Sequence, residues 1–358
     1  MEIILPYFIA IALCALLLYF LTPIAKKVGL VDRPNDRKRH DGSVPLIGGI
    51  AMGSSFPLSM WLFPIGLESY RILFFCVGAL LVVGVLDDHQ DIPAWAKFVT
   101  QMVIATLLVF LDEKVVFFIG DIFDTGISQG LNVFAPWLTV IAIVAIINAF
   151  NMIDGHDGLA ALVTIISLGS LLFLSTYNGV GQEHFFFISL FITVVATFLI
   201  FNHSSFVGRD RQVYMGDAGS MFLGLIVAYF LIELSQRGAP VVNFGIPAIK
   251  PSAVPWIIGL PFLDQVSVMA KRIMKGRKLW IADRGHIHHF FLDAGFGKHL
   301  TLALLVLIHG GLVIMGILGT VFDWPDWILF WGAILVLLLY LGVARLTPRK
   351  IKTNRAGQ

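Results

Sequence analysis

Long apolar runs, separated by short polar segments, extend along the chain from its start to about residue 346. A helix needs about 20 apolar residues to cross the hydrocarbon core of a bilayer. By this measure the candidate spans are 3–22, 46–64, 71–86, 95–111, 136–150, 159–177, 185–201, 218–234, 254–270, 301–321 and 327–346. The pattern predicts an all-α, polytopic integral membrane protein with about eleven transmembrane helices.

The composition supports a membrane protein. The chain has 358 residues, of which 58% are hydrophobic and 13% are charged. Soluble domains carry about 25% charged residues, so lipid is the better outer solvent for this chain. We interpret residues 1–358 as a single transmembrane domain, with a basic tail at about 345–358. The bilayer is an expected partner, and nucleic acid is not.

The basic residues predict the orientation, because cytoplasmic loops of membrane proteins are enriched in Lys and Arg. With the N-terminus periplasmic and the C-terminus cytoplasmic, most of the 25 Lys and Arg residues fall on the cytoplasmic side. The exceptions are Arg71, Lys114, Arg237 and Lys250.

Five polar clusters interrupt this pattern. The first reads RPNDRKRH over 33–40, includes Lys38, and is followed by VPLIGG at 44–49. Pro and paired Gly break helices and let the backbone approach an anionic ligand closely. A pyrophosphate-bearing substrate fits this cluster; a basic loop that only sets topology is the alternative.

The second cluster, DDHQD, ends an apolar run. Asp87 and Asp91 are four residues apart and Asp88 and Asp91 three apart, so on a helix they can share a face. Charges inside a bilayer cost at least about 2.5–3.5 kcal/mol on insertion scales. A cation would offset this cost, and Mg²⁺ prefers oxygen ligands and bridges to phosphates. A solvated helix end without metal is the alternative.

The third and fourth clusters also combine acidic groups with glycine. NAFNMIDGHDG at 148–158 resembles a substrate loop rather than a simple helix cap, since it offers Asn148, Asn151, Asp154 and Asp157. Asn202 then precedes YMGDAGS at 214–220, in which Asp217 is either a helix N-cap or a metal ligand.

The fifth cluster is DRGHIHH at 283–289. It contains Arg284, His286, His288 and His289. Histidines can hold a metal, donate to phosphates or transfer protons. The spacing matches no zinc-finger or zincin pattern, so we favour anion contact near a metal over structural zinc or a plain surface loop. Asp264, inside a predicted span, is expected to pair with a neighbouring polar group.

All five clusters fall on the cytoplasmic side in an orientation derived from Lys and Arg alone. Carboxylates, basic residues and histidines at one membrane face suit phosphoryl transfer, which depends on positioning and on neutralising phosphate charge. A metal-ion or proton-coupled transporter is the alternative, although transport sites usually lie near the midplane.

The motifs RPNDRKRH…VPLIGG, DDHQD, NAFNMIDGHDGLA, MGDAGS and HIHH, in this order, resemble those of the polyprenyl-phosphate N-acetylhexosamine-1-phosphate transferases. Within that family the chain is most similar to the bacterial branch that uses UDP-GlcNAc and undecaprenyl phosphate. The branch that uses UDP-MurNAc-pentapeptide typically shows a TPTMGG-like sequence where this chain has VPLIGG.

The resemblance implies transfer of GlcNAc-1-phosphate from UDP-GlcNAc to undecaprenyl phosphate, with Mg²⁺ or Mn²⁺ as cofactor. The lipid product would start O-antigen or common-antigen type assembly at the bacterial inner membrane, from a site facing the cytoplasm. Another UDP-N-acetylhexosamine as donor is the close alternative. A homodimer is also considered as a partner arrangement.

The resemblance also implies residue roles. Asp217 is the expected Mg²⁺ ligand, with Asp88 near the metal and Asp87 as the base that deprotonates or orients the lipid phosphate. Asn148, Asn151, Asp154 and Asp157 match the nucleotide-binding loop. Contacts to uridine, phosphate or sugar are expected from Lys38, Asn202, Arg284, His286, His288 and His289.

Overall fold

The computed structural model describes residues 4–32, 43–62, 67–236, 247–276 and 285–346. The predicted all-α fold is confirmed over these residues, where the only strands are the paired two-residue segments β1 (Val31–Asp32) and β2 (Val44–Pro45). The longer helices are α1 (Leu5–Val28), α2 (Gly48–Trp61), α3 (Arg71–Gln90), α4 (Ala94–Leu111), α5 (Ala135–Ile153), α6 (Leu159–Tyr177), α7 (Gln182–Asn202), α9 (Gly216–Gln236), α11 (Gly259–Met274), α13 (Lys298–Val321) and α14 (Asp326–Leu346).

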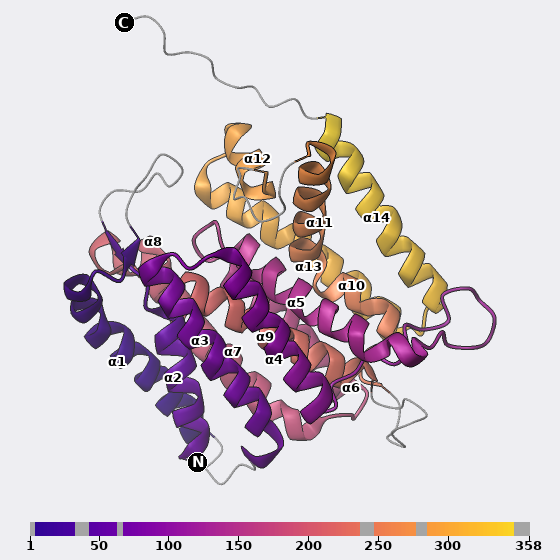
Figure 1. Ribbon diagram of the computed structural model, residues 1–358, viewed down its shortest axis with the longest axis horizontal. Coiled ribbons are helices and arrows are strands. Elements are labelled where there is room, and N and C mark those ends of the chain that lie inside the picture. The colour runs from indigo at the N-terminus through magenta and orange to yellow at the C-terminus, as the bar shows by residue number, and fades with distance from the viewer. Residues whose placement is uncertain (1–3, 33–42, 63–66, 237–246, 277–284, 347–358) are drawn as a thin grey trace, which may run out of the picture.

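The short helices lie at breaks in this bundle. They are α8 (Ser204–Val207), α10 (Val254–Ile257) and α12 (Ile287–Asp293). In Figure 1, α8 and α12 lie at the same upper end of the bundle. The segment 251–257 meets α11 at an angle of 78°, so the predicted span 254–270 is a bent helix pair rather than a straight helix.

The helices have the length and apolarity of a multi-pass membrane protein. Nine helices in the described part of the chain are long and apolar enough to span a bilayer, or ten if the bent pair forms one span. Helix α2 has 14 residues, which is short for a straight crossing. The count of eleven and the orientation remain predictions.

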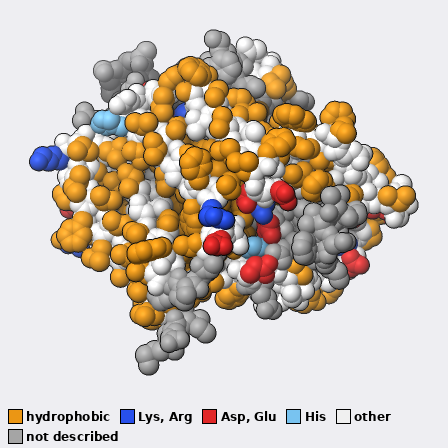
Figure 2. Space-filling view, turned by 60° about the horizontal axis from the view of Figure 1, so that its bottom comes forward, with side chains coloured by type: hydrophobic (Ala, Val, Ile, Leu, Met, Phe, Trp, Pro, Cys, Tyr) orange, Lys and Arg blue, Asp and Glu red, His pale blue; other side chains and the backbone are white. Residues whose placement is uncertain are grey.

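Hydrophobic side chains cover much of the outer surface. Figure 2 shows a face that is largely orange, with a group of acidic and basic side chains near its centre and a few others toward its edges. Such a surface suits lipid rather than water.

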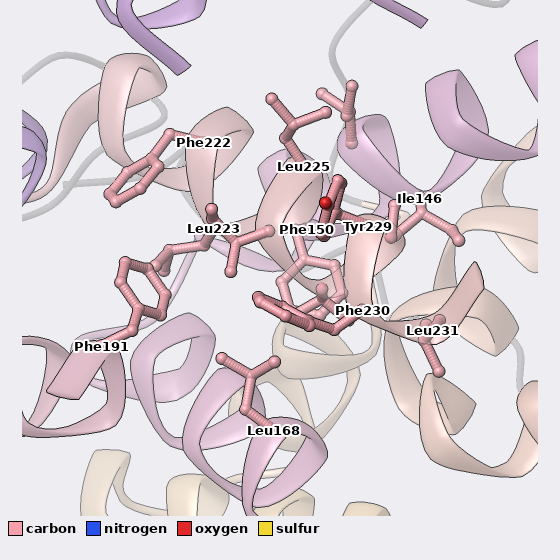
Figure 3. Close-up of a cluster of buried hydrophobic side chains, with 14 of the residues drawn as sticks. Ile146, Phe150, Leu168, Phe191, Phe222, Leu223, Leu225, Tyr229, Phe230 and Leu231 are labelled. Carbon is pink, nitrogen blue, oxygen red and sulfur yellow. The ribbon is translucent and has the colours of Figure 1, made fainter. Parts of the chain in front are cut away.

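Helix α9 is the central element of the bundle. It packs against α2, α3, α5 and α6, and nearly every residue from Ala218 to Ser235 is buried. Figure 3 shows Phe222, Tyr229 and Phe230 of α9 among Phe150 of α5 and Phe191 of α7. A helix that is apolar on all sides fits either a protein interior or lipid. Helix α14 is at least as apolar and is mostly exposed, so apolarity alone does not place α9 at the centre.

Glycine lets two helices approach α9 closely at its first turn. A Cβ added to Gly84 of α3 would lie 2.2 Å from Cα of Ala218, and one added to Gly49 of α2 would lie 2.4 Å from N of Gly219. No side chain fits in these gaps. The absence of a Cβ at both positions therefore brings the polar ends of α2 and α3 to the start of α9.

A polar network holds the other end of α9. Glu233 accepts hydrogen bonds from Lys114 Nζ at 2.7 Å, and its second oxygen lies 3.2 Å from Nε2 of His184. Nδ1 of the same imidazole lies 2.7 Å from the Tyr70 hydroxyl. These contacts join α9 to α7, to the 3₁₀ turn before α3 and to the segment after α4, so both ends of the central helix are fixed by polar groups.

We expect Gly84→Ala to destabilise the protein by about 1–3 kcal/mol, because the added methyl group must displace backbone. Thermal unfolding of the purified protein in detergent measures the effect. Gly78→Ala, on the same helix, is the matched control, since a Cβ there meets nothing within 4 Å. The control should be neutral or slightly stabilising. Equal unfolding temperatures for the two variants would contradict this account of the packing.

Candidate active site

The segments that precede α2 and α9 pair with each other and align the first and fourth clusters. The Tyr214 amide donates to the Pro45 carbonyl at 2.9 Å, and the Gly48 amide donates to the Tyr214 carbonyl at 2.9 Å. The Gly49 amide donates to the Met215 carbonyl at 3.0 Å. The VPLIGG and YMGD motifs are far apart in sequence, but their backbones are hydrogen-bonded side by side.

Two carboxylates and one lysine form the centre of the site. Lys97 Nζ of α4 lies 2.7 Å from Asp87 Oδ2 of α3 and 3.0 Å from Asp217 Oδ2 of α9. The side chain of Asp87 is 7% exposed, whereas that of Asp217 is 34% exposed. The lysine offsets the repulsion between the two acids, and Asp217 remains the carboxylate more open to a ligand.

Asp88 holds the first turn of α9. Its Oδ1 accepts from the Asp217 amide at 2.8 Å, and its Oδ2 accepts from the Ala218 amide at 3.3 Å. A carboxylate at a helix N-terminus satisfies otherwise unpaired amides and interacts favourably with the helix dipole. Gly216 has φ of 71°, and a Cβ there would lie 2.2 Å from Asp88 Oδ2. Asp88 thus positions Asp217 directly.

The two asparagines at the end of α5 face neighbouring helices. Asn151 Nδ2 donates to Ser220 Oγ of α9 at 2.9 Å, one turn after Asp217. Asn148 Nδ2 donates to Gln101 Oε1 of α4 at 2.6 Å and to the Val144 carbonyl at 2.8 Å. Asn151 is therefore next to the carboxylate centre, while Asn148 links α4 to α5 behind it.

The nucleotide-binding loop predicted from the third cluster follows α5 directly. Asp154 caps α5, and Asp157 Oδ2 accepts from Gln212 Nε2 at 3.1 Å. Burial raises the pKa of Tyr214 well above its usual range, and the carboxylate of Asp157 raises it further. The phenol is therefore neutral at physiological pH and hydrogen-bonds Asp157 of this loop.

Asn202 is 4% exposed and hydrogen-bonded to backbone at both ends of its amide. Its Oδ1 accepts from the Gly158 amide at 2.6 Å, and its Nδ2 donates to the Val213 carbonyl at 2.9 Å. These bonds tie the loop after α5 to the segment before α9. The structure favours a supporting role for this residue, and direct contact with substrate stays a prediction.

The histidine cluster lies against the third cluster. His286 Nδ1 is 2.8 Å from Asp264 Oδ2 of α11, which confirms the expected polar partner of Asp264. His288 is 2% exposed, and a Cβ added to Gly155 would lie 2.4 Å from its Cε1. His289 packs on His288, with ring centroids 4.2 Å apart. The histidines therefore reach the same end of the bundle as the carboxylates.

The donor set fits an oxygen-preferring cation. Asp87 Oδ1 is buried and makes no hydrogen bond within the described residues. Asp217 beside it is partly exposed, and both belong to the carboxylate class of ligand that Mg²⁺ uses. Among the residues that the structure describes, no three His, Cys, Asp or Glu side chains are grouped closely enough to hold a metal by themselves. A cation here would need further oxygens from substrate or water.

Two predicted contacts, Lys38 and Arg284, lie outside the described residues, as does most of the basic tail. The structure adds two residues that the motifs missed, Lys97 and Gln212. In the sequence, Lys97 is only one of the basic residues on the predicted cytoplasmic side. Its signal is a lone cation near the start of an apolar span, six residues after the DDHQD motif.

Known proteins resemble the chain over nearly its whole length. Glycosyl transferase family 4 matches residues 70–235, which include Asp87, Lys97 and Asp217. The undecaprenyl-phosphate alpha-N-acetylglucosaminyl 1-phosphate transferase of Escherichia coli strain K12 is 31% identical over 353 residues, covering 96% of this chain and 94% of that protein.

Two further relatives carry the same name. The protein from Pasteurella multocida strain Pm70 is 34% identical over 339 residues, covering 91% of this chain and 88% of the relative. The protein from Salmonella typhi is 32% identical over 318 residues, covering 88% and 84%. Similarity at this level and over this length is that of one family. The chain therefore belongs to glycosyl transferase family 4 and is a membrane-embedded glycosyl-1-phosphate transferase.

Proposed function

We propose that the protein transfers GlcNAc-1-phosphate from UDP-GlcNAc to undecaprenyl phosphate, giving undecaprenyl-pyrophosphoryl-GlcNAc and UMP. The observation that carries this proposal is the Asp87–Lys97–Asp217 centre. Asn151 links it to the end of α5, and His288 contacts the loop that follows α5. The names of the full-length relatives support the choice of acceptor and sugar.

The position of the site at one end of the bundle suits a reaction between a soluble donor and a lipid acceptor. The acceptor phosphate stays at the membrane surface while its apolar chain remains in lipid. With the orientation predicted from Lys and Arg, this end faces the cytoplasm of a bacterial inner membrane, where nucleotide sugars are available. Initiation of O-antigen or common-antigen type polysaccharides is the corresponding proposed pathway.

In the reaction, an oxygen of the lipid phosphate forms a bond to the β-phosphorus of the donor. The bond from that phosphorus to the oxygen bridging the two phosphates breaks, and UMP leaves with the bond electrons. Asp87 accepts the proton of the lipid phosphate or orients its oxygen, and Lys97 neutralises negative charge that gathers between the two phosphates. Direct attack is favoured over a covalent enzyme intermediate.

A divalent cation, Mg²⁺ or Mn²⁺, belongs to this proposal. Asp217 would hold it together with Asp87. Asp88, expected from the sequence to lie near the metal, is proposed instead to fix the helix turn that presents Asp217, because both its oxygens accept from backbone amides of that turn. When bound, it would neutralise the charge of the diphosphate and help UMP to leave. Asn151, Asp154, Asp157 and Tyr214 are the groups proposed to meet the nucleotide. Asn151 contacts Ser220 one turn after Asp217, and the others lie in or beside the loop that follows α5.

The decisive assay combines purified protein, UDP-GlcNAc, undecaprenyl phosphate and Mg²⁺. We expect lipid-linked GlcNAc and UMP in equal amounts, and loss of product when EDTA removes the metal. A panel of other UDP-N-acetylhexosamines tests the close alternative of a different donor sugar. Absence of product with every donor and every divalent metal would overturn the proposed function.

Asp217→Asn and Asp87→Asn are expected to abolish turnover, because each removes a charge from the reacting centre while keeping the side-chain volume. Turnover and thermal unfolding are measured together. Asp210→Asn is a control: this acid lies in the 3₁₀ turn before α9, and no hydrogen bond or ion pair among the described residues joins it to the centre. Full activity of either site variant, in a folded protein, would refute the assigned roles.

Lys97→Met is expected to lower the free energy of unfolding by about 1–2 kcal/mol, since two neighbouring acids lose their shared cation. The value is reduced from that of a fully buried pair because Lys97 is 24% exposed.

We also expect the Lys97→Met substitution to lower turnover on the order of 10²-fold, with Lys97→Arg retaining part of it. Added Mg²⁺ should raise the unfolding temperature of Lys97→Met more than that of the wild type. An unchanged response to Mg²⁺ would count against a cation at Asp87 and Asp217.

A further inference from the structure

Asp264 of α11 is a buried carboxylate with no role in the mechanism above. We propose that Asp264 is a positioning residue that acts through His286: it fixes the imidazole ring and its tautomer, so that the other ring nitrogen serves the diphosphate. This inference rests on the proposed transferase reaction and goes beyond it, because it assigns a function to a residue inside a predicted span.

Both oxygens of Asp264 are used by the start of the histidine helix. Oδ2 lies 2.8 Å from His286 Nδ1, and Oδ1 accepts from the Ile287 amide at 2.8 Å. A carboxylate only accepts hydrogen bonds, so Nδ1 of His286 carries the proton. The Nε2 atom is then the one left to accept a proton or, in the imidazolium form, to donate to phosphate.

Asp264 and His286 differ in how far solvent or substrate can reach them. The side chain of Asp264 is 1% exposed, whereas that of His286 is 12% exposed. A substrate phosphate can therefore meet the imidazole but not the carboxylate. Tyr340 of α14 is a further titratable group close enough to Asp264 to interact with it electrostatically. The carboxylate is thus enclosed by protein, as a group that acts only through its partner should be.

His286 is connected to the substrate loop through His288. The rings of His286 and His288 are nearly parallel, at 9°, with centroids 5.7 Å apart. His288 in turn fills the space beside Gly155, where a Cβ would lie 2.6 Å from its Nε2. A chain of contacts therefore runs from Asp264 through two imidazoles to the loop that carries Asp154 and Asp157.

A purely structural carboxylate would act differently. Asn at position 264 could still accept the Ile287 amide and preserve the start of α12, but it would remove the negative charge that holds Nδ1–H of His286. Groups that orient a functional imidazole in this way typically contribute about 10- to 100-fold to activity. A positioning role for Asp264 therefore predicts that Asp264→Asn lowers activity even when the fold is unchanged, whereas a purely structural role does not.

The test is a double-mutant cycle on the full-length protein, with Asp264→Asn, His286→Gln and the double variant. We expect Asp264→Asn to lower kcat by about 10- to 100-fold with little change in KM for UDP-GlcNAc. In the His286→Gln background the same change should cause no further loss. Ser267→Ala, a buried position one turn along α11, is the control and should keep wild-type kinetics.

Thermal unfolding is recorded for each variant. If Asp264→Asn does not fold, Asp264→Glu replaces it in the same cycle, since it keeps the charge but displaces it by one methylene. Losses that add fully in the double variant, or an effect confined to KM, would overturn the positioning role. A wild-type protein that is inactive with every UDP-sugar would instead overturn the proposed function.

Discussion

The contact of Lys97 with Asp87 and Asp217 is the constraint on which the site depends. Two acids this close to an apolar bundle need a cation, because unpaired charge near lipid is costly. The lysine contacts both acids only if the end of α3 and the starts of α4 and α9 lie at the same level. The close packing of α9 against Gly49 and Gly84 makes this alignment possible. The geometry of the site therefore depends on the helix packing.

The position of helix α9 along its own axis is fixed by polar contacts at its two ends. Its interior is apolar on every side and cannot by itself select a position along its axis. Polar groups at its two ends do so: Asp88 binds the amides of the first turn, and Lys114 and His184 bind Glu233 near the last turn. A shift of one turn would break both sets, which explains why a helix with so few polar residues has a defined register.

Much of the fold could be predicted from the apolar runs, because lipid-exposed helices must be long and continuous. The orientation rule also predicted that the five clusters would share one side, and the structure places the described ones at one end. The prediction of one span over 254–270 misses the bend between 251–257 and α11, although the run contains the helix breakers Gly259 and Pro261 at the bend. The partners of Lys97 were not predictable, because they come from helices up to 120 residues away.

The polar residues of the motifs divide into two groups that the sequence does not distinguish. Asp88, Asn202 and Asp264 use side-chain oxygens to bind backbone amides, so they shape the loops and helix starts. Asp217 and His286 keep part of their surface exposed. The first group is the reason why the second can be exposed without being mobile. An aspartate in a motif is thus not by itself a ligand, and the partner of each oxygen decides which acids are left to meet a phosphate.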